Sequence, residues 1–363
     1  MPHRRTRRFS SDSLRSFCTE VLCRAGLPRA DAWVVADSLV FADLRGVGSH
    51  GVMRMGIYTK RIEMGLVNKT PVMKVLKEDP CTVAFDGDNG MGQVVGMAGM
   101  DKAISLARVS GVGAVTVMNS NHFGACAYYA VRACRNDMIG VALSNAPSTL
   151  APWGGRAPYL GTNPVAIAVP AGKYDHVMLD MAASVVARAK IILAARKGEE
   201  IPLGWAIDPS GRPTTDPKAA LKGSVLPFGG PKGYGVAFMV EVLAGILSGS
   251  DFGKHIGSLY EDFSRPQNLG HFFLAINVGS FMAPEVFRQR MDALIDEIKA
   301  VPCADGVRQV LVPGEPEQMS YSEGMERGVA LDETVIRDLS ALGQAKGIPF
   351  PSPLPEPERS CAM

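Results

Sequence analysis

The sequence predicts an α+β fold rather than a regular alternation of strands and helices. Apolar residues at helical spacing dominate both ends of the chain, whereas the middle consists of short apolar runs typical of strands. Because these segments do not alternate as βαβ units, a doubly wound parallel sheet is disfavoured. The 363 residues, of which 47% are hydrophobic, are enough for two or three domains.

Three helices are predicted before residue 70. Apolar residues recur at helical spacing over residues 11–44, and Gly26-Leu27-Pro28 divides that stretch into two helices. A third helix is expected over residues 51–65, with Ser49 able to cap its beginning and Gly65 to close its end.

After Thr70-Pro71, the sequence changes from segments with helical spacing to short apolar runs typical of strands. The predicted strands are residues 73–76, 81–86, 112–118, 139–144, 165–169, 177–180 and 271–278. The predicted helices in the same region and beyond it are residues 96–109, 236–247, 285–301 and 332–346. We therefore expect a discontinuous helical domain of residues 1–75 with 285–345, a mixed-sheet domain of residues 76–284, and a flexible proline-rich tail of residues 346–363. A small subdomain near residues 76–120 is an open alternative.

Charge and hydropathy exclude several classes of partner. The 38 basic and 36 acidic residues leave a net charge of +2, too small a field to favour nucleic acid or an anionic membrane. The longest apolar run, residues 236–247, contains Glu241 and is shorter than the roughly 20 residues that span a membrane. Asp12, Arg15 and Glu20 interrupt any secretory signal, so we expect a cytoplasmic protein, with a mitochondrial-type presequence in the basic N-terminus as the alternative.

Several common catalytic motifs are missing from the sequence. There is no P-loop, and the glycines of residues 90–96 are spaced one residue too widely for G-x-G-x-x-G. Residues 47–51 lack the first glycine of G-x-S-x-G, and H-E-x-x-H is absent. The histidines stand apart from cysteines at zinc-ligand spacing, so no metal site is expected.

One polar cluster suits acid chemistry. If a helix begins near Ser49, then His50, Arg54 and Tyr58 lie at i, i+4 and i+8 on one face. Histidine exchanges protons near neutral pH, and arginine binds a carboxylate through two parallel hydrogen bonds. The cluster therefore suits a substrate with a hydroxyl or carbonyl next to a carboxylate. The alternative is a solvated helix face with Ser49 as an ordinary cap.

Three further segments could bind a ligand or merely form turns. Residues 119–124, which include His122, follow a predicted strand, and both interpretations stay open for them. Lys232 stands at the beginning of an apolar helix, where it could meet a phosphate or belong to a flexible loop. Asp180 ends a strand and could orient a histidine, hold a ribose hydroxyl or cap a helix.

Taken together, the motifs resemble those of the type 2 malate/L-lactate dehydrogenases, a family separate from the Rossmann-fold enzymes of the same name. The matching motifs run in order from Asp43 to Gly235: DLRGVGSHGVMRM, NSNHFGA, SNAPSTLAPWGG, GTNPVAIAVP, LDMAAS, PTTDPKAAL and PFGGPKGYG. The resemblance implies NAD or NADP bound on a largely antiparallel, non-Rossmann sheet, a helical domain built from both chain ends, and a homodimer. It further implies a small carboxylate substrate, interconverted between a 2-hydroxy and a 2-oxo acid.

The resemblance also implies roles for individual residues. His50, with Ser49 beside it, would exchange the proton, and His122 is a competing acid/base. Arg54 would hold the substrate carboxylate. The other residues expected on the substrate side are Tyr58, Thr162 and Asn163. Those expected at the dinucleotide are Asp180, Met181, Ala182, Pro231, Lys232, Gly314, Glu315 and Cys126.

Departures from the family pattern leave the substrate and cofactor preference open. Gly48 stands where the family often has Asp, and Ala189 replaces the glycine of the usual A-R-G-K. Reduction of a cyclic imino acid and oxidation of ureidoglycolate are alternatives within the family. A hydrolase that uses Ser49 and His50 is a remote alternative, because adjacent residues seldom let a histidine reach the neighbouring serine. A non-catalytic binding protein is a further alternative.

Overall fold

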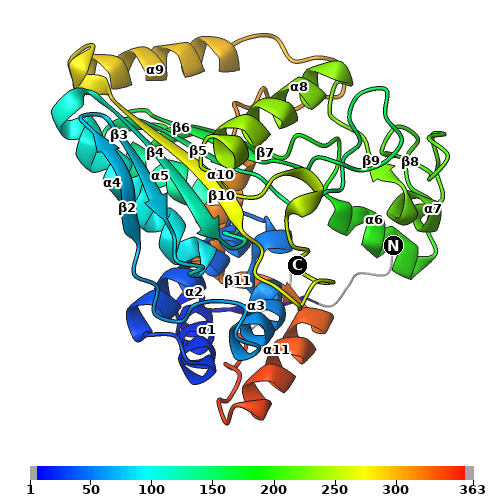
Figure 1. Ribbon diagram of the computed structural model, residues 1–363. Helices are drawn as coiled ribbons and strands as arrows, with labels where there is room; N and C mark the ends of the chain where they lie inside the picture. The colour runs from blue at the N-terminus through cyan, green and yellow to red at the C-terminus, as the bar shows by residue number, and fades with distance from the viewer. Residues whose placement is uncertain (1–5, 356–363) are drawn as a thin grey trace. The chain divides into compact units, whose positions relative to one another are not determined.

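The computed structural model describes residues 6–355, and these fall into two compact units (Figure 1). One unit combines the chain up to Gly65 with the chain from Glu315 onward, and the other is the continuous stretch Leu66–Gly314. The first five and the last eight residues lie outside the described residues. They include the beginning of the basic N-terminal segment and the end of the predicted tail.

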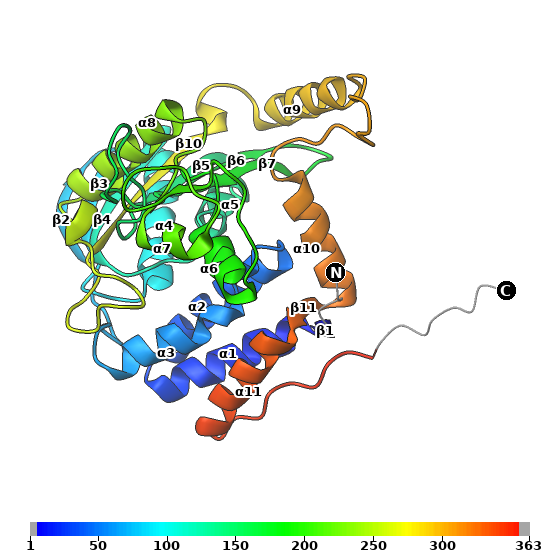
Figure 2. The same ribbon diagram turned by 90° about the vertical axis from the view of Figure 1, so that its right-hand side faces the viewer.

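The unit built from both chain ends is mainly helical. Its elements are α1 (Ser11–Ala25), α2 (Arg29–Leu44), α3 (Met55–Glu63), α10 (Glu315–Arg327), α11 (Glu333–Ala345), and the strands β1 (Thr6–Phe9) and β11 (Val329–Asp332). The two strands pair antiparallel, with Phe9 opposite Val329 (Figure 2). The predicted break between α1 and α2 is confirmed, because Gly26 adopts φ 109° and ends α1.

Part of the predicted flexible tail is packed in this unit. The Phe350 ring contacts Phe9 and Phe17 with ring centroids 5.2 and 5.0 Å apart. The backbone N–H of Leu354 donates to the carbonyl oxygen of Arg8. The prolines of this segment disfavour a helix and a paired strand, but they still allow an aromatic side chain to pack in the core.

The second unit contains a mixed seven-stranded sheet, as expected for an α+β fold. Its strands are β2 (Lys74–Asp79), β3 (Thr82–Asp86), β4 (Val112–Ser120), β5 (Met138–Ser144), β6 (Val165–Pro170), β7 (His176–Met181) and β10 (Leu269–Asn277). Their spatial order is β2-β3-β4-β10-β5-β6-β7. Among the described strands, β3 and β4 pair parallel and the other neighbours pair antiparallel.

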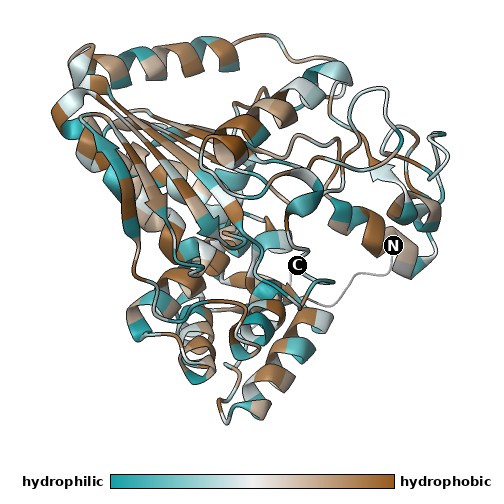
Figure 3. Cartoon of the chain, viewed as in Figure 1, coloured by the Kyte–Doolittle hydropathy of each residue, from teal (hydrophilic) through white to brown (hydrophobic). Residues whose placement is uncertain are grey.

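Helices cover both faces of the sheet. α4 (Gly92–Ser110) and α5 (Ala127–Cys134) pack on one face, where Phe273 of β10 is fully buried beside Gly99. On the other face lie α8 (Pro231–Val240) and a single π-helical stretch (Glu241–Ile246), against Leu143 and Phe272. The middle strands are coloured mainly hydrophobic in Figure 3, as strands covered on both faces must be.

The helix α9 (Pro284–Lys299) belongs with the sheet rather than with the terminal helices. Ile295 and Met291 of α9 pack against Ala171 and Val312. The contacts therefore divide the chain at residues 65 and 314, whereas we predicted boundaries at 75 and 285. Amphipathic periodicity reveals that α9 buries one face but does not reveal the partner of that face.

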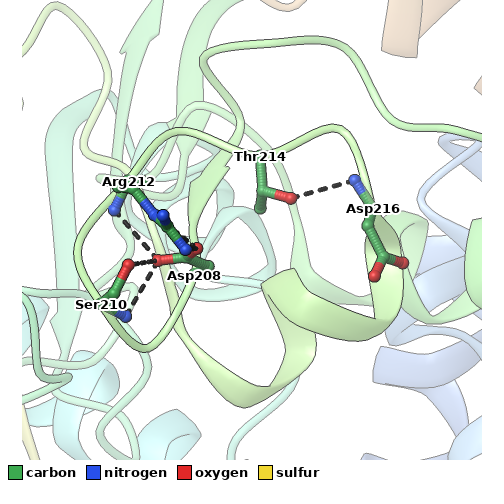
Figure 4. A network of polar contacts seen from close by, with 5 residues as sticks. All are labelled: Asp208, Ser210, Arg212, Thr214 and Asp216. Atoms are coloured by element: carbon green, nitrogen blue, oxygen red, sulfur yellow. Dashed lines mark hydrogen bonds and ion pairs between the residues drawn. The ribbon is translucent and has the colours of Figure 1, made fainter.

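A small lobe follows β7. It contains α6 (Arg188–Lys197), β8 (Ala206–Ile207), α7 (Pro217–Lys222) and β9 (Ser224–Val225). Its turn is held by Asp208, whose carboxylate accepts hydrogen bonds from Ser210 and Arg212, while Asp216 caps α7 (Figure 4). These hydrogen bonds, the Ser210 hydroxyl first, lower the pKa of Asp208 to about 2. In the described part of the chain, no helix is long and apolar enough to cross a bilayer.

Candidate active site

We predicted that the segment with Ser49, His50 and Arg54 begins a helix, but this prediction is wrong. The segment forms two successive 3-10 turns, Gly48–His50 and Val52–Arg54, and α3 begins only at Met55. The helical face shared by His50, Arg54 and Tyr58 therefore does not exist, and Tyr58 is buried on α3. In a 3-10 turn the side chains at i and i+3 are aligned, a spacing that 3.6-residue periodicity does not give.

The adjacent side chains of Ser49 and His50 are in contact. Ser49 Oγ lies 3.0 Å from His50 Nδ1, a contact that we expected to be rare between adjacent residues. A hydroxyl can rotate to donate to a bare Nδ1 or to accept from a protonated one. Ser49 can therefore hydrogen-bond to either tautomer of His50.

Arg54 completes this cluster. Its Nε–H donates to the carbonyl oxygen of Ser49 over 2.7 Å, which ties the second 3-10 turn to the first. Burial, and after it the charge of Arg54, lower the pKa of His50 to about 4. The imidazole is therefore neutral at physiological pH and ready to accept a proton.

The depressed pKa of His50 predicts an unusual pH profile. If His50 is the base that the resemblance implies, oxidation needs its neutral form, so kcat/KM should hold its value as the pH falls through 6.5 and should decline only near pH 4. The same shift stabilises the neutral folded form, so His50 lowers the unfolding free energy as the pH drops from about 6.5 towards 4. An initial-rate profile in the oxidation direction measures the first effect. A fall in kcat/KM near pH 6.5 in the parent enzyme that is absent from His50→Asn would contradict the first prediction.

The competing histidine, His122, has a different environment. It follows β4, and its backbone N–H donates to Gln267 Oε1 over 3.1 Å. Its Nδ1 accepts the backbone N–H of Gly124 over 3.3 Å. Because a backbone N–H can only donate, this arrangement favours the tautomer with the proton on Nε2. The neutral ring of His122 is therefore set up as a hydrogen-bond donor.

The amides around His122 satisfy turns. Asn119 Nδ2 donates to Asp86, and Asn121 Nδ2 donates to Asn89 and to the carbonyl oxygen of Gly90. Of the two interpretations that the sequence left open for residues 119–124, turn formation accounts for these two side chains.

Asn163 corrects one of our predictions. It was expected to line the substrate, but it is fully buried. Its Nδ2 donates to Glu241 and to the carbonyl oxygen of Ala237, and its Oδ1 accepts the backbone N–H of Ala146. The side chain is therefore engaged inside the fold. Its neighbour Thr162 is half-buried and accepts the backbone N–H of Ala183 through its carbonyl oxygen.

Replacement of Asn163 should cost stability rather than substrate affinity. Asn163→Ala removes one hydrogen bond each from the buried Glu241 carboxyl group and the Ala237 carbonyl and the acceptor of the Ala146 N–H, a loss of about 2–5 kcal/mol in the free energy of unfolding. We expect urea denaturation to show that loss, while KM of the folded enzyme stays within about twofold. A large rise in KM with unchanged stability would return Asn163 to the substrate side.

Two of the segments expected at a dinucleotide lie beside β7 or beside the chain that leaves it. The backbone N–H of Met178 donates to Pro313, and a Cβ on Gly314 would lie 2.6 Å from the carbonyl oxygen of Met178. The N–H of Phe228 donates to Ala183, which places the start of α8 beside the chain that leaves β7. Of the residues expected at the dinucleotide, Gly314 thus lies beside β7, Asp180, Met181 and Ala182 belong to the end of β7 and its exit, and Pro231 and Lys232 begin α8. Glu315 begins α10 in the helical unit.

Cys126 belongs to the same region but is poorly suited to polar contact. It directly precedes α5 and is 1% exposed. Burial first, and the charge of Asp180 second, raise the pKa of its thiol. Cys126 is therefore a neutral thiol within electrostatic range of Asp180.

Sequence reasoning missed two buried polar groups. His271 on β10 joins Ser144 and Ser120 through its two ring nitrogens and stacks on Phe123, 4.4 Å between centroids. Burial lowers the pKa of His271 to about 3, so it stays neutral. The other group is Asp43, the first residue of the DLRG motif, whose spacing from other polar residues does not indicate a role. Over the described residues no set of three or more His, Cys, Asp or Glu side chains could hold a metal ion.

Comparison with known proteins identifies close relatives along nearly the whole chain. A family model described as malate/L-lactate dehydrogenase matches residues 9–340. L-sulfolactate dehydrogenase of Methanocaldococcus jannaschii is 42% identical over 91% of this chain and 94% of that protein. The solved structure of the sulfolactate dehydrogenase from that organism has a TM-score of 0.88 at 40% identity, covering 95% of this chain and 98% of its own. Malate dehydrogenase of Pyrococcus abyssi is 41% identical over 94% and 95%.

Relatives that use either dinucleotide also match. Ureidoglycolate dehydrogenase (NAD(+)) of Escherichia coli K12 is 36% identical over 92% of this chain and 95% of that protein. (2R)-3-sulfolactate dehydrogenase (NADP(+)) of Chromohalobacter salexigens is 36% identical over 93% of this chain and 98% of that protein.

Proposed function

This chain belongs to the malate/L-lactate dehydrogenase family and is an NAD(P)-dependent 2-hydroxy acid dehydrogenase, in which we propose that His50 exchanges the substrate proton. The observation that supports this role is the contact between Ser49 Oγ and His50 Nδ1. When the ring takes a proton on Nε2 from the substrate hydroxyl, Ser49 can accept from Nδ1–H. In the reverse direction, Ser49 supports the return of that proton to the carbonyl oxygen of a 2-oxo acid.

The other side chains are assigned by the chemistry that they offer. Arg54, already oriented by its bond to Ser49, would bind the substrate carboxylate end-on through its two terminal nitrogens. His122, with its proton on Nε2, would donate a hydrogen bond to the substrate oxygen rather than remove its proton. Thr162 stays a candidate for the substrate side.

The residues near the end of β7 fit a dinucleotide. Gly229 and Gly230 have φ of 54° and 63°, so the chain enters α8 without side chains and directs the helix N-terminus and Lys232 towards solvent, a combination that suits a pyrophosphate. The Asp180 carboxylate suits ribose hydroxyls. When bound, the nicotinamide supplies the hydride acceptor or donor.

A substrate panel tests this function. Pyruvate, oxaloacetate, 3-sulfopyruvate and a cyclic imino acid should be assayed with NADH and with NADPH, following the loss of reduced cofactor. We expect turnover of at least one 2-oxo acid. Turnover of the cyclic imine alone would replace the proposed substrate class, and no turnover with any substrate would favour a binding protein.

We also propose a homodimer in the cytoplasm. Four large apolar side chains on α8 and the π-helical stretch are about half exposed: Phe238, Met239, Ile246 and Leu247. Adjacent exposed apolar residues of this size are typical of a contact surface. Light scattering coupled to size-exclusion chromatography should return about twice the mass of one chain.

A further inference from the structure

Asp43 lies beside the loop that carries the proposed acid/base. It is in the last turn of α2, five residues before the first 3-10 turn. Its Oδ2 accepts the backbone N–H of Val52, the first residue of the second 3-10 turn, over 2.7 Å. This bond ties the loop to α2 at the point between His50 and Arg54.

The Asp43 carboxylate leaves no space for a side chain at Gly51 but leaves space for one at Gly48. A Cβ on Gly51 would lie 1.9 Å from Asp43 Oδ1 and 2.2 Å from its Cγ, so the Asp43 carboxylate or the loop would have to move to admit it. A Cβ on Gly48 would lie 3.5 Å from the same oxygen, an ordinary contact. Gly51 has φ −88° and ψ −158°, a conformation open to any residue. Gly51 is therefore required by the approach of the carboxylate, not by its own backbone.

We propose that Asp43 is a positioning residue, whose carboxylate holds the 48–54 loop against α2 and thereby sets the places of His50 and Arg54. The proposal rests on the function assigned to His50. The loop closes on itself through four further bonds: His50 N–H to Val47, Gly51 N–H to Gly48, Arg54 N–H to Gly51, and Arg54 Nε–H to Ser49. The backbone N–H of Val47 ties the start of the loop to Ala42 of α2, and the Val52 bond ties its middle to Asp43.

The anchor does not depend on the charge of Asp43. Burial raises the pKa of Asp43 to about 7, although the bond from Val52 opposes the rise. Protonation of one carboxyl oxygen still leaves the other able to accept the Val52 N–H. An asparagine supplies the same acceptor without charge, so Asp43→Asn is the conservative variant.

The test compares four loop variants of the full chain in steady-state assays with the best 2-oxo acid. Asp43→Ala should lower kcat about 10²-fold, the size of effect expected when a reacting group moves by roughly 1 Å. Asp43→Asn should recover kcat to within about fivefold of the parent enzyme. Gly51→Ala should lose activity as Asp43→Ala does, whereas Gly48→Ala, the same substitution three residues earlier, should retain it.

A double variant shows whether the glycine and the carboxylate act together. If Gly51→Ala fails because its methyl group meets Asp43, then Asp43→Ala with Gly51→Ala should be no slower than Asp43→Ala alone. Multiplied losses in the double variant would overturn the inference. So would equal losses in Gly48→Ala and Gly51→Ala, or a kcat of Asp43→Ala equal to that of the parent enzyme.

Two readouts separate positioning from simple loss of stability and from failure of the proposed function. Asp43→Ala that only lowers the melting temperature, with kcat per folded molecule unchanged, would overturn the inference. In a His50→Asn background, Asp43→Ala should cost no further kcat. If His50→Asn itself keeps full activity, the role of His50 fails; if it loses activity and Asp43→Ala does not, the role of Asp43 alone fails.

Discussion

His50→Asn should lower kcat by about 10²–10⁴-fold and leave the fold intact, because a positioned acid/base contributes a factor of that order. Asparagine fills a similar space and can still meet Ser49 Oγ, so the loop keeps its contact. The amide does not titrate in the accessible pH range, and proton exchange is lost. The measurement is kcat at saturating substrate and cofactor, with circular dichroism to verify the fold.

His122→Asn is the matched control for that experiment. Its ring is assigned a donor role through Nε2, so its replacement removes one hydrogen bond to the substrate oxygen and not the proton acceptor. We expect a smaller loss, about 10-fold in kcat/KM. If His122→Asn suffers the larger loss and His50→Asn keeps a parental kcat, the two histidines exchange roles.

Much of the fold followed from periodicity. The strands of the sheet lie within a few residues of their predicted positions, because each alternates or runs apolar between turn residues. The elements missed were α5, α6, α7, α10, the β8–β9 pair and the β1–β11 pair. β1 has the sequence Thr-Arg-Arg-Phe, which carries no strand signal, and it exists because β11 pairs with it 320 residues later in the chain. Propensity holds no information about such a distant partner.

The candidate site was predictable as a set of residues but not as a geometry. His50 and Arg54 were selected for their chemistry, and a helix was assumed to align them. In the actual loop, Asp43 accepts the backbone N–H of Val52, and its carboxylate lies where a Cβ on Gly51 would stand. That long-range constraint is invisible in the local spacing, as is the burial of Asn163, which stands between Thr162 and Pro164 in a predicted turn.

Arg54→Met should raise KM for the 2-oxo acid by about 10- to 100-fold, because hydrogen bonds between charged groups contribute about 1.5–3 kcal/mol and each 1.4 kcal/mol is tenfold in affinity. Methionine keeps the length of the side chain and removes the two terminal nitrogens assigned to the carboxylate. Arg54→Lys is the matched control, since it keeps the charge and loses the planar fork. We expect its KM to fall between those of the parent enzyme and Arg54→Met.

The same substitution has a second, independent consequence through His50. The charge of Arg54 helps to lower the pKa of His50, after burial, so Arg54→Met should move the acidic limb of kcat/KM to higher pH, and Arg54→Lys should leave it nearly in place. A KM that does not change in Arg54→Met would remove the carboxylate role. A shifted limb beside that unchanged KM would still place the guanidinium at the imidazole, where it tunes the base without touching the substrate. Movement of both values together is the result that the Arg54–Ser49–His50 arrangement requires.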